Sequence, residues 1–426
     1  MPGRGTQIRC AFRIRSQRKR DSDMKKKELE LYVHIPFCVR KCAYCDFLSF
    51  PSGERERASY VDALIREIRS QKKNFTTHCV TTVFLGGGTP SVLSGDDTAR
   101  IFRALRENFD ISRQAEITME VNPGTVTEEK AGMWKACGVN RLSIGLQSVN
   151  DEELRMLGRI HSFRGFLHTW EIVRDAGFDN INIDLISAVP GQTLESWEHT
   201  LRTAAELGPE HLSAYSLIIE EGTPFYEKYG EPSRAGTPEA GKEPLPPLPD
   251  EDTEREIYKA SKRILEEYGY DRYEISNYAK EGRKCRHNLG YWERKEYLGL
   301  GLGAASLIEE TRFHNTEDME KYLDLFGQKG AESEEIFSPA GAAAEEIECL
   351  SEEERMEEFM FLGLRKTEGV SRDAFHDVFG KKIEDVYGEQ ISRFTGLGLL
   401  EATGGMICLT EKGIDVSNAI FSEFMI

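Results

Sequence analysis

Six β-prone segments, separated by stretches of helical periodicity, constrain the fold of this 426-residue chain more than any other feature. The segments are rich in apolar and β-branched residues, and the stretches between them repeat apolar residues at helical spacing. They cover residues 29–36, 81–86, 115–121, 141–147, 180–186 and 211–218. Successive strand–helix units build a parallel sheet with helices packed against it. We therefore predict an α/β fold, a partial (β/α)6 barrel, since six strands need not close as eight do.

Three cysteines directly follow the first predicted strand. Cys38, Cys42 and Cys45 have the spacing C-x3-C-x2-C, after the apolar run from Leu31 to Phe37. Loops that follow the strands of α/β proteins are where such proteins place their chemistry. Three thiolates can hold three irons of a [4Fe–4S] cluster and leave the fourth iron open to a small ligand. A structural zinc site is the weaker alternative, because it needs a fourth ligand and usually a second C-x2-C pair, which the sequence lacks.

The residues around these cysteines resemble the radical S-adenosylmethionine (SAM) superfamily. Tyr44 supplies the aromatic residue just before the last cysteine, and Tyr32-x-His34-Ile-Pro-Phe-Cys resembles one branch of it. That branch contains oxygen-independent coproporphyrinogen III dehydrogenase and the HemW-type heme chaperones, and the resemblance covers most of residues 29–426. It implies a radical-SAM barrel that holds a [4Fe–4S] cluster through the three cysteines. It also implies that SAM chelates the open iron through its amino and carboxylate groups.

Residues at the ends of the next strands are the expected SAM contacts. A glycine run after the second strand lets the backbone approach a ligand closely. Polar side chains at the carboxyl ends of successive parallel strands converge on one mouth, although each alone also has a structural explanation as a turn-former, cap or surface ion pair. The resemblance assigns SAM contacts to Tyr32, Tyr44, Gly87, Gly88, Thr89, Glu120, Gln147, Arg159 and Asp184.

A later segment carries the residues that the resemblance associates with heme. His287-Asn288-x-x-Tyr291-Trp292 follows Cys285 and is typical of the heme-chaperone branch. A neutral imidazole is a common axial ligand of heme iron, and aromatic faces suit a flat macrocycle. A buried histidine with aromatic neighbours is the structural alternative, and Cys285 is a competing ligand. The resemblance implies a chaperone that binds heme and transfers it to an acceptor heme protein.

Oxidative decarboxylation of coproporphyrinogen III is the alternative function, and it would make the chain an enzyme. The branch with that activity resembles C-x3-C-x2-C-x-C, with a fourth cysteine where this chain has Phe47. The long N-terminal segment that helps to cover the substrate in that branch has no clear counterpart here. Both departures disfavour the oxidase reading.

The charge distribution narrows the partners. The net charge is −18, but residues 1–27 carry ten Lys and Arg against two acids, so the remainder carries −26. An acidic body is a poor nucleic-acid binder, because phosphate contacts supply most of that affinity. No apolar run approaches the ~18 residues of a membrane span, and nine mostly scattered cysteines indicate a reducing cytoplasm. Peripheral membrane contact and a homodimer stay open.

Composition divides the chain into five predicted regions. Residues 1–28 form a basic extension that we expect to be disordered, and 29–229 form the radical SAM core. Residues 230–253 are a Pro/Gly-rich insertion, 254–345 extend the core, and 346–426 form a mostly helical, winged-helix-like cap domain. Residues 1–23 are either a targeting leader or an extension ahead of a start at Met24, and we expect the second.

Overall fold

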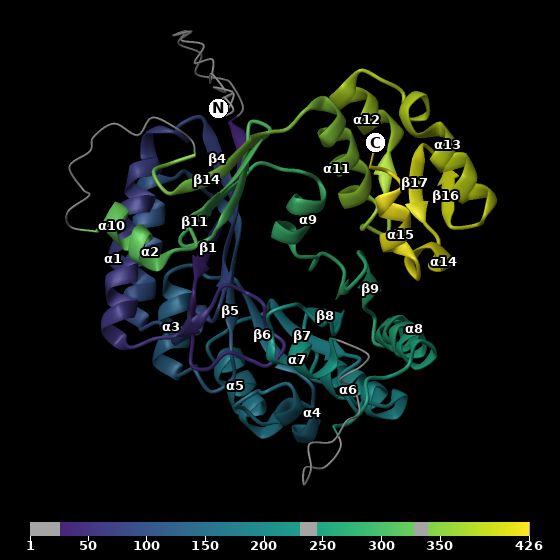
Figure 1. The fold of residues 1–426 in the computed structure, drawn as a ribbon. Helices are drawn as coiled ribbons and strands as arrows, with labels where there is room; N and C mark the ends of the chain where they lie inside the picture. Colours follow the sequence, from purple (N-terminus) through teal and green to yellow (C-terminus); the bar gives the residue numbers. More distant parts are fainter. Residues whose placement is uncertain (1–25, 231–244, 328–339, 426) are drawn as a thin grey trace, which may run out of the picture.

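The computed structural model describes residues 26–230, 245–327 and 340–425. A 12-stranded sheet with its helices forms one body, and the residues from 350 onward form a second, smaller body beside it (Figure 1). The second body contains its own three-stranded sheet.

All six predicted strands form, and they lie in chain order in the parallel centre of the large sheet. They are β1 (Lys27–Ile35), β4 (His78–Gly87), β5 (Ile111–Val121), β6 (Arg141–Gln147), β7 (Ile181–Ser187) and β8 (His211–Ser216). The partial-barrel prediction is confirmed, because the strand order of the sheet is open at both ends and the sheet does not close.

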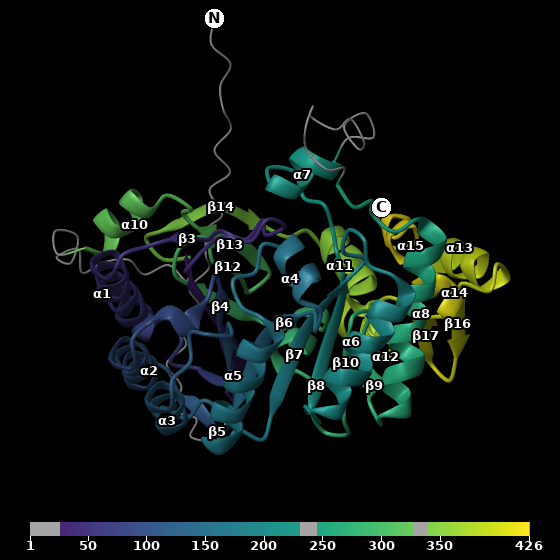
Figure 2. The ribbon, with the colours of Figure 1, turned by 90° about the horizontal axis from the view of Figure 1, so that it is seen from below.

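Helices connect these strands and follow one another around the outside of the sheet (Figure 2). They are α1 (Glu54–Ser70), α2 (Gly95–Asn108), α3 (Glu128–Ala136), α5 (Phe163–Asp175), α6 (Leu194–Glu206) and α8 (Glu251–Glu267). Side-chain oxygens cap several of their N-termini: Ser94, Ser162 and Thr193 each accept a hydrogen bond from a backbone N–H three residues on, which satisfies a donor that the helix cannot.

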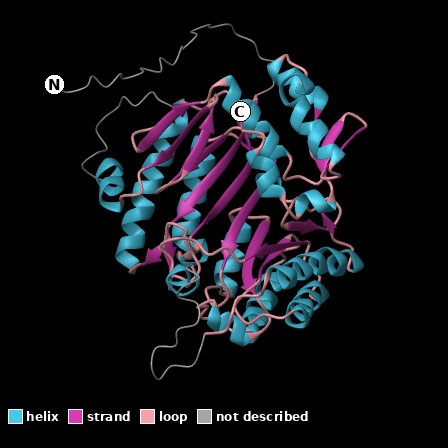
Figure 3. Ribbon diagram, turned by 45° about the vertical axis from the view of Figure 1, so that its right-hand side comes forward, coloured by secondary structure: helices cyan, strands magenta, loops and turns pink. Residues whose placement is uncertain are grey.

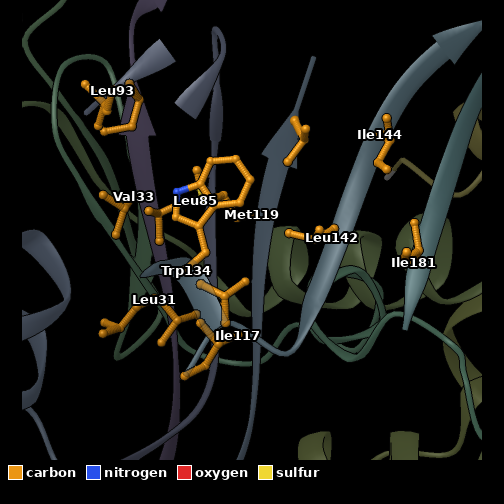
Figure 4. Packing of buried hydrophobic residues seen from close by; sticks show 14 of the residues in the cluster. Leu31, Val33, Leu85, Leu93, Ile117, Met119, Trp134, Leu142, Ile144 and Ile181 are labelled. Carbon is orange, nitrogen blue, oxygen red and sulfur yellow. The ribbon is translucent and has the colours of Figure 1, made fainter. Parts of the chain in front are cut away.

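Strand side chains alternate between the two faces of the sheet. The outer face is apolar, and the Trp134 ring of α3 lies among Leu85, Ile117 and Met119 (Figure 4). The concave face is polar. Its buried side chains include Glu30, Thr82, Glu116, Thr118, Arg141, Ser143, Asn182, His211 and Ser213.

The sheet is wider than the sequence predicted. β11 (Tyr297–Leu300) pairs parallel with β1, and β12 (Ala305–Ile308), β13 (Thr311–Asn315) and β14 (Ala344–Cys349) continue it antiparallel. At the other edge, β10 (Asn277–Ala279) pairs antiparallel with β8 and with β9 (Asp271–Arg272). These strands are short and partly polar, so they lack a strong alternating pattern. The boundary expected after residue 345 falls inside β14.

Shorter elements fill the connections. They are β2 (Phe37–Cys38), β3 (Phe50–Pro51), the 3-10 turns η1 (Gln71–Lys73) and η2 (Pro90–Val92), α4 (Asp151–Met156), α7 (Pro224–Tyr229), α9 (Arg286–Trp292) and α10 (Met319–Phe326).

The C-terminal body packs around its own apolar core, which includes Phe375, Tyr387 and Phe424. Figure 3 shows its helices and small sheet beside the large one. Its elements are α11 (Glu352–Gly363), β15 (Val370–Ser371), α12 (Arg372–Phe379), α13 (Ile383–Gly396), β16 (Leu400–Thr403), β17 (Met406–Leu409), α14 (Glu411–Ile414) and α15 (Ser417–Ser422). Helices with a small antiparallel sheet are what the sequence predicted.

Parts of four predicted regions lie outside the described residues: 1–25 of the basic extension, 231–244 of the insertion, 328–339 of the core extension and residue 426 of the cap domain. In the described parts, β1 begins at Lys27, inside the expected extension. Likewise, α8 begins at Glu251, inside the expected insertion.

Candidate cluster and cofactor site

The three cysteines lie on one loop beyond the carboxyl end of β1, and their thiols are free. Cys38 Sγ lies 3.4 Å from the Thr89 hydroxyl, and an Arg159 Nη donates to Cys42 Sγ at 3.5 Å. Burial raises the pKa of the Cys45 thiol, and the neighbouring Cys42 and Cys38 add to that shift. Holding these thiols in the thiolate form therefore requires nearby positive charge, which a metal cluster would supply.

Backbone contacts fix the loop to two later segments. The Ala43 N–H donates to Leu157 O at 3.2 Å, and the Phe225 N–H donates to Ala43 O at 3.0 Å. The Arg40 side chain donates to Gly158 O at 2.6 Å. The loop is therefore held between the end of α4 and the start of α7, which lie more than a hundred residues further along the chain.

His34 holds the far end of the same loop, a role that the sequence interpretation missed. Its Nε2 lies 2.9 Å from Leu48 O, and its Nδ1 lies 3.0 Å from the Tyr32 hydroxyl. Burial lowers the pKa of His34, so the imidazole is neutral. A Cβ atom at Gly87, where φ is +105°, would lie 2.4 Å from this ring. A histidine at the end of the strand that leads into the cysteines was the available signal.

The Gly87–Thr89 turn packs directly against the start of the cysteine loop. The Gly88 N–H donates to Ile35 O at 2.9 Å, and the Thr89 N–H donates to Phe37 O at 2.7 Å. The Gly87 N–H donates to Glu120 at 3.1 Å. Because these amides are already used, the groups that this turn can offer to a ligand are its carbonyls.

Glu120 on β5 and Asp184 on β7 face the same region from the two strands on either side of β6. Burial, and after it the charge of Asp184, raises the pKa of Glu120 to about 8. Asp184 accepts hydrogen bonds from Ser143 at 2.8 Å and from Asn182 at 2.7 Å. Two buried carboxyl groups within electrostatic reach suit a ligand that brings hydroxyl donors or positive charge.

Arg159 and Gln147 complete the mouth. Arg159 donates to Asn122 Oδ1 at 2.6 Å and to Gly145 O at 2.9 Å, and Asn122 in turn donates to the Thr89 hydroxyl at 2.7 Å. Gln147 ends β6 with φ +72°, a left-handed conformation that non-glycine residues rarely adopt, and such strain gathers at binding sites. Asn122 is a further site residue that the sequence interpretation passed over.

This donor set fits the expected cluster. In a cubane each thiolate binds a different iron, so three cysteines need not converge on one point. A single zinc ion would need such convergence, and in the described ranges no group of three or more His, Cys, Asp and Glu is arranged to hold one ion. A small pocket beside the loop is lined by Val39, Cys42, Asn122, Arg159 and His161, among others.

The predicted heme residues lie elsewhere on the concave face. His287 is 1% exposed, with Nδ1 2.7 Å from the Thr82 hydroxyl and Nε2 3.0 Å from the Tyr291 hydroxyl. Burial, and after it the charge of Arg141, lowers its pKa to about 3. Glu30 lies 3.7 Å from Nδ1, five positions before the end of β1, so His287 is about 15 Å from the cysteine loop along the strand.

Cys285 is a buried thiol in the same region. Its exposure is 0%, its Sγ lies 3.6 Å from Glu116 Oε1, and burial raises its pKa to about 12. It is therefore protonated at neutral pH, which makes it a weaker candidate ligand than the neutral imidazole of His287.

The other predicted heme residues lie on α9 itself, together with His287. The Tyr291 ring meets the His287 ring edge-on at 4.9 Å, and the Asn288 N–H faces the Cys285 sulfur. Trp292 is covered by the Arg365 guanidinium at 4.5 Å, and its indole N–H is buried without a partner. The structure thus brings the heme residues together, apart from the cysteine mouth.

Two family descriptions match the chain: the radical SAM superfamily over residues 32–204 and the HemN C-terminal domain over residues 350–416. A solved structure described as Escherichia coli coproporphyrinogen III oxidase (HemN), a radical SAM enzyme, is similar with a TM-score of 0.78 at 24% identity. It covers 94% of this chain and 90% of that chain, and at this identity the likeness shows the fold. Among the described helices, none is both long enough and apolar enough to cross a membrane.

The relatives match over 66% to 92% of this chain. The heme chaperone HemW of Bacillus subtilis is 35% identical over 92% of this chain and 98% of that protein. HemW of Escherichia coli is 40% identical over 66% of this chain and 70% of that protein. A Danio rerio protein, mitochondrial radical S-adenosyl methionine domain-containing protein 1, is 30% identical over 92% of this chain and 84% of that protein. The chain therefore belongs to the HemW family of the radical SAM superfamily.

Proposed function

We propose that this protein is a heme chaperone that carries a [4Fe–4S] cluster and SAM, binds heme and passes it to an acceptor heme protein. The observation that carries the proposal is the similarity to proteins named heme chaperone HemW, which extends over 98% of the Bacillus subtilis protein. Family membership and the three free thiols on one loop support the cluster and SAM.

Cys38, Cys42 and Cys45 are the proposed cluster ligands. When bound, a cluster held by three thiolates offers one open iron position to a small ligand. The Arg159 guanidinium balances the Cys42 thiolate and can also pair with a carboxylate of SAM. Glu120 and Asp184 are the proposed acceptors for the ribose and amino groups of SAM, with the carbonyls of Gly87 and Gly88 beside them.

Coproporphyrinogen III oxidation is the weaker alternative. Its support is the fold likeness to HemN, which at 24% identity carries fold alone. Phe47 stands where that branch has its fourth cysteine, and the side chain is 63% exposed at the rim of the loop. An exposed phenyl ring cannot replace the chemistry of a thiol.

His287 is the proposed heme ligand. Ligation of iron by Nε2 requires that this nitrogen leave the Tyr291 hydroxyl and that α9 shift, because the ring is almost fully buried. Its lowered pKa keeps the imidazole neutral, which is the form that coordinates iron. Asn288, Tyr291 and Trp292 would line the macrocycle.

An anaerobic assay with the cluster-loaded full chain separates the two functions. Heme is titrated and followed by its Soret band, while coproporphyrinogen III consumption and 5′-deoxyadenosine are measured in parallel samples. The chaperone proposal expects saturable heme binding without porphyrin products. Turnover of coproporphyrinogen III without heme binding would replace it with the alternative.

The proposed compartment is the cytoplasm. Three thiols that must ligate iron have to stay reduced, and a reducing compartment provides that condition. The acceptor heme protein is the partner that the proposal requires.

A further inference from the structure

Arg141 is a buried cation without a partner on the concave face of the sheet. Its exposure is 2%, and its Nε is buried without a hydrogen bond. Within the part of the chain that the structure describes, no side chain or backbone group forms a hydrogen bond or an ion pair with this guanidinium. Burying an unpaired charge is costly, so a partner for it is expected.

The nearest carboxylates do not supply that partner, because they are engaged elsewhere. Glu116 accepts hydrogen bonds from the backbone N–H groups of Arg286 and His287 at the start of α9. Asp184 accepts from Ser143 and Asn182. Both acids lie within electrostatic reach of Arg141, but neither forms a direct pair with it.

A second orphaned group lies beside it. Thr118 on β5 is the in-register neighbour of Arg141 on β6, and its exposure is 0%. Its hydroxyl oxygen is also buried without a hydrogen-bond partner. An unpaired guanidinium and an unpaired hydroxyl on adjacent strands offer two kinds of donor to one acceptor, and a planar carboxylate matches the guanidinium fork.

We propose that Arg141 and Thr118 bind a carboxylate of the ligand held on the concave face. This inference rests on the proposed function, because heme carries two propionate carboxylates. The place agrees with His287 as the ligand of the iron, since Arg141 lies close enough for its charge to act on that imidazole. The pair would fix the orientation of the macrocycle through one of its propionates.

A comparison of heme with its dimethyl ester tests the inference directly. Both are titrated into the full chain and followed by the Soret band. We expect the wild type to bind heme about 10- to 100-fold more tightly than the ester, the range of a charge-assisted hydrogen-bonded pair. Arg141→Met is expected to bind heme as weakly as the ester, with ester binding unchanged. A wild type that binds both equally, or an Arg141→Met variant that keeps the preference, overturns the inference.

The melting temperature of the ligand-free protein separates a binding role of Arg141 from a structural role, because only a structural role predicts that Arg141→Met melts at a lower temperature. If Arg141 waits for a ligand, Arg141→Met should unfold at the same temperature as the wild type or higher. The matched control is Arg272, another buried arginine, which donates to both Glu411 oxygens at 2.8 and 2.9 Å. Arg272→Met should lower the melting temperature and leave the heme-to-ester ratio unchanged. A comparable fall in Arg141→Met would make Arg141 a structural residue and end the proposal.

The Thr118→Val variant and sodium propionate test the carboxylate site separately from heme binding. Thr118→Val keeps the side-chain shape and should reduce the ratio of the affinity for heme to the affinity for the ester. An unchanged ratio would count against the site. Sodium propionate alone should raise the melting temperature of the wild type and not that of Arg141→Met. If heme fails to bind but propionate still raises the melting temperature of the wild type and not that of Arg141→Met, the proposed function fails and the carboxylate site stands. If propionate has the same effect on both proteins, the carboxylate site fails as well.

Discussion

Arg159 donates a hydrogen bond to the sulfur of Cys42 at 3.5 Å, across 117 positions of the chain. The same guanidinium donates to Asn122 and to Gly145 O. It therefore ties the cysteine loop to the carboxyl ends of β5 and β6. A cation beside a cysteine favours its thiolate, the form that binds iron, so this contact joins the proposed cluster site to the proposed SAM site.

The cysteine loop should determine iron content. Anaerobically reconstituted protein is expected to bind about four irons per chain, as a cubane cluster requires. Changing Cys38, Cys42 and Cys45 together to Ala should abolish this iron in a colorimetric iron and sulfide assay. Cys79→Ala, Cys137→Ala and Cys408→Ala are the controls and should retain it. Equal iron in the triple variant, or one zinc ion in its place, would refute the cluster.

Arg159 should act mainly on SAM. Arg159→Met removes the cation that is proposed to pair with the SAM carboxylate, so SAM affinity should fall by about 10-fold or more, the cost of a lost charge-assisted hydrogen bond. The reduced cluster should remain visible by electron paramagnetic resonance, with a smaller SAM-induced spectral change than in the wild type. Arg155→Met, on the surface of α4, is the control. Equal SAM affinities of the wild type, Arg159→Met and Arg155→Met would show that Arg159 does not bind SAM.

Glu67 should make the stability of the ligand-free protein depend on pH. It is buried on α1 and accepts hydrogen bonds from Gly301, Asn315 and Tyr322, which joins α1 to the loop after β11 and to α10. Burial raises its pKa from 4.5 to about 7, although those hydrogen bonds oppose the shift. A raised pKa means that its stabilisation is complete below pH 4.5 and is lost as the pH rises through about 7.

The expected fall in unfolding free energy over this range is about 3 kcal/mol. Urea unfolding at several pH values measures it, and Glu67→Gln should flatten the slope that this residue causes. The comparison uses the slope with pH, because the substitution also changes hydrogen bonds at every pH. A variant with the same slope as the wild type would show that another group titrates.

The C-terminal body should hold α9 in place. Just after α9, Arg294 donates to Glu358 of α11 at 2.8 Å, and Arg312 pairs with the same carboxylate. The Glu358 side chain is 5% exposed, so Glu358→Ala should cost about 3 kcal/mol by leaving Arg294 partly unpaired. Hydrogen exchange should rise in residues 286–292. Glu353→Ala, at an exposed position of α11, serves as the comparison, and unchanged exchange at α9 in Glu358→Ala would contradict the coupling.

The regular part of the fold follows from the sequence, because β1 and the next five parallel strands are apolar runs separated by amphipathic helices. The strands beyond Asp271 escape the same reasoning. Tyr297–Leu300, for example, becomes a strand only because it pairs with β1, a long-range contact that local pattern does not encode. Tertiary pairing decides such short segments.

The site divides in the same way. Cys38, Cys42 and Cys45 are readable from spacing alone, and the polar residues at the strand ends follow from the rule that such ends converge. The roles of Asn122 and Arg141 could not be predicted, because they depend on which hydrogen bonds these residues make or lack, whereas His34 offered one signal, its position at the end of β1. For Arg141 the sequence shows only an arginine at the start of a strand, whereas the structure shows that its buried Nε makes no hydrogen bond.

Heme titration of three proteins tests the central claim most directly. Wild-type full chain, His287→Ala and Cys285→Ala are titrated anaerobically with heme, and the Soret band gives the affinity and the ligand environment. The account predicts saturable binding by the wild type, weaker binding with a shifted Soret band for His287→Ala, and near wild-type behaviour for Cys285→Ala, whose thiol is protonated. No saturable binding by the wild type, or His287→Ala that binds heme like the wild type while Cys285→Ala does not, would contradict it.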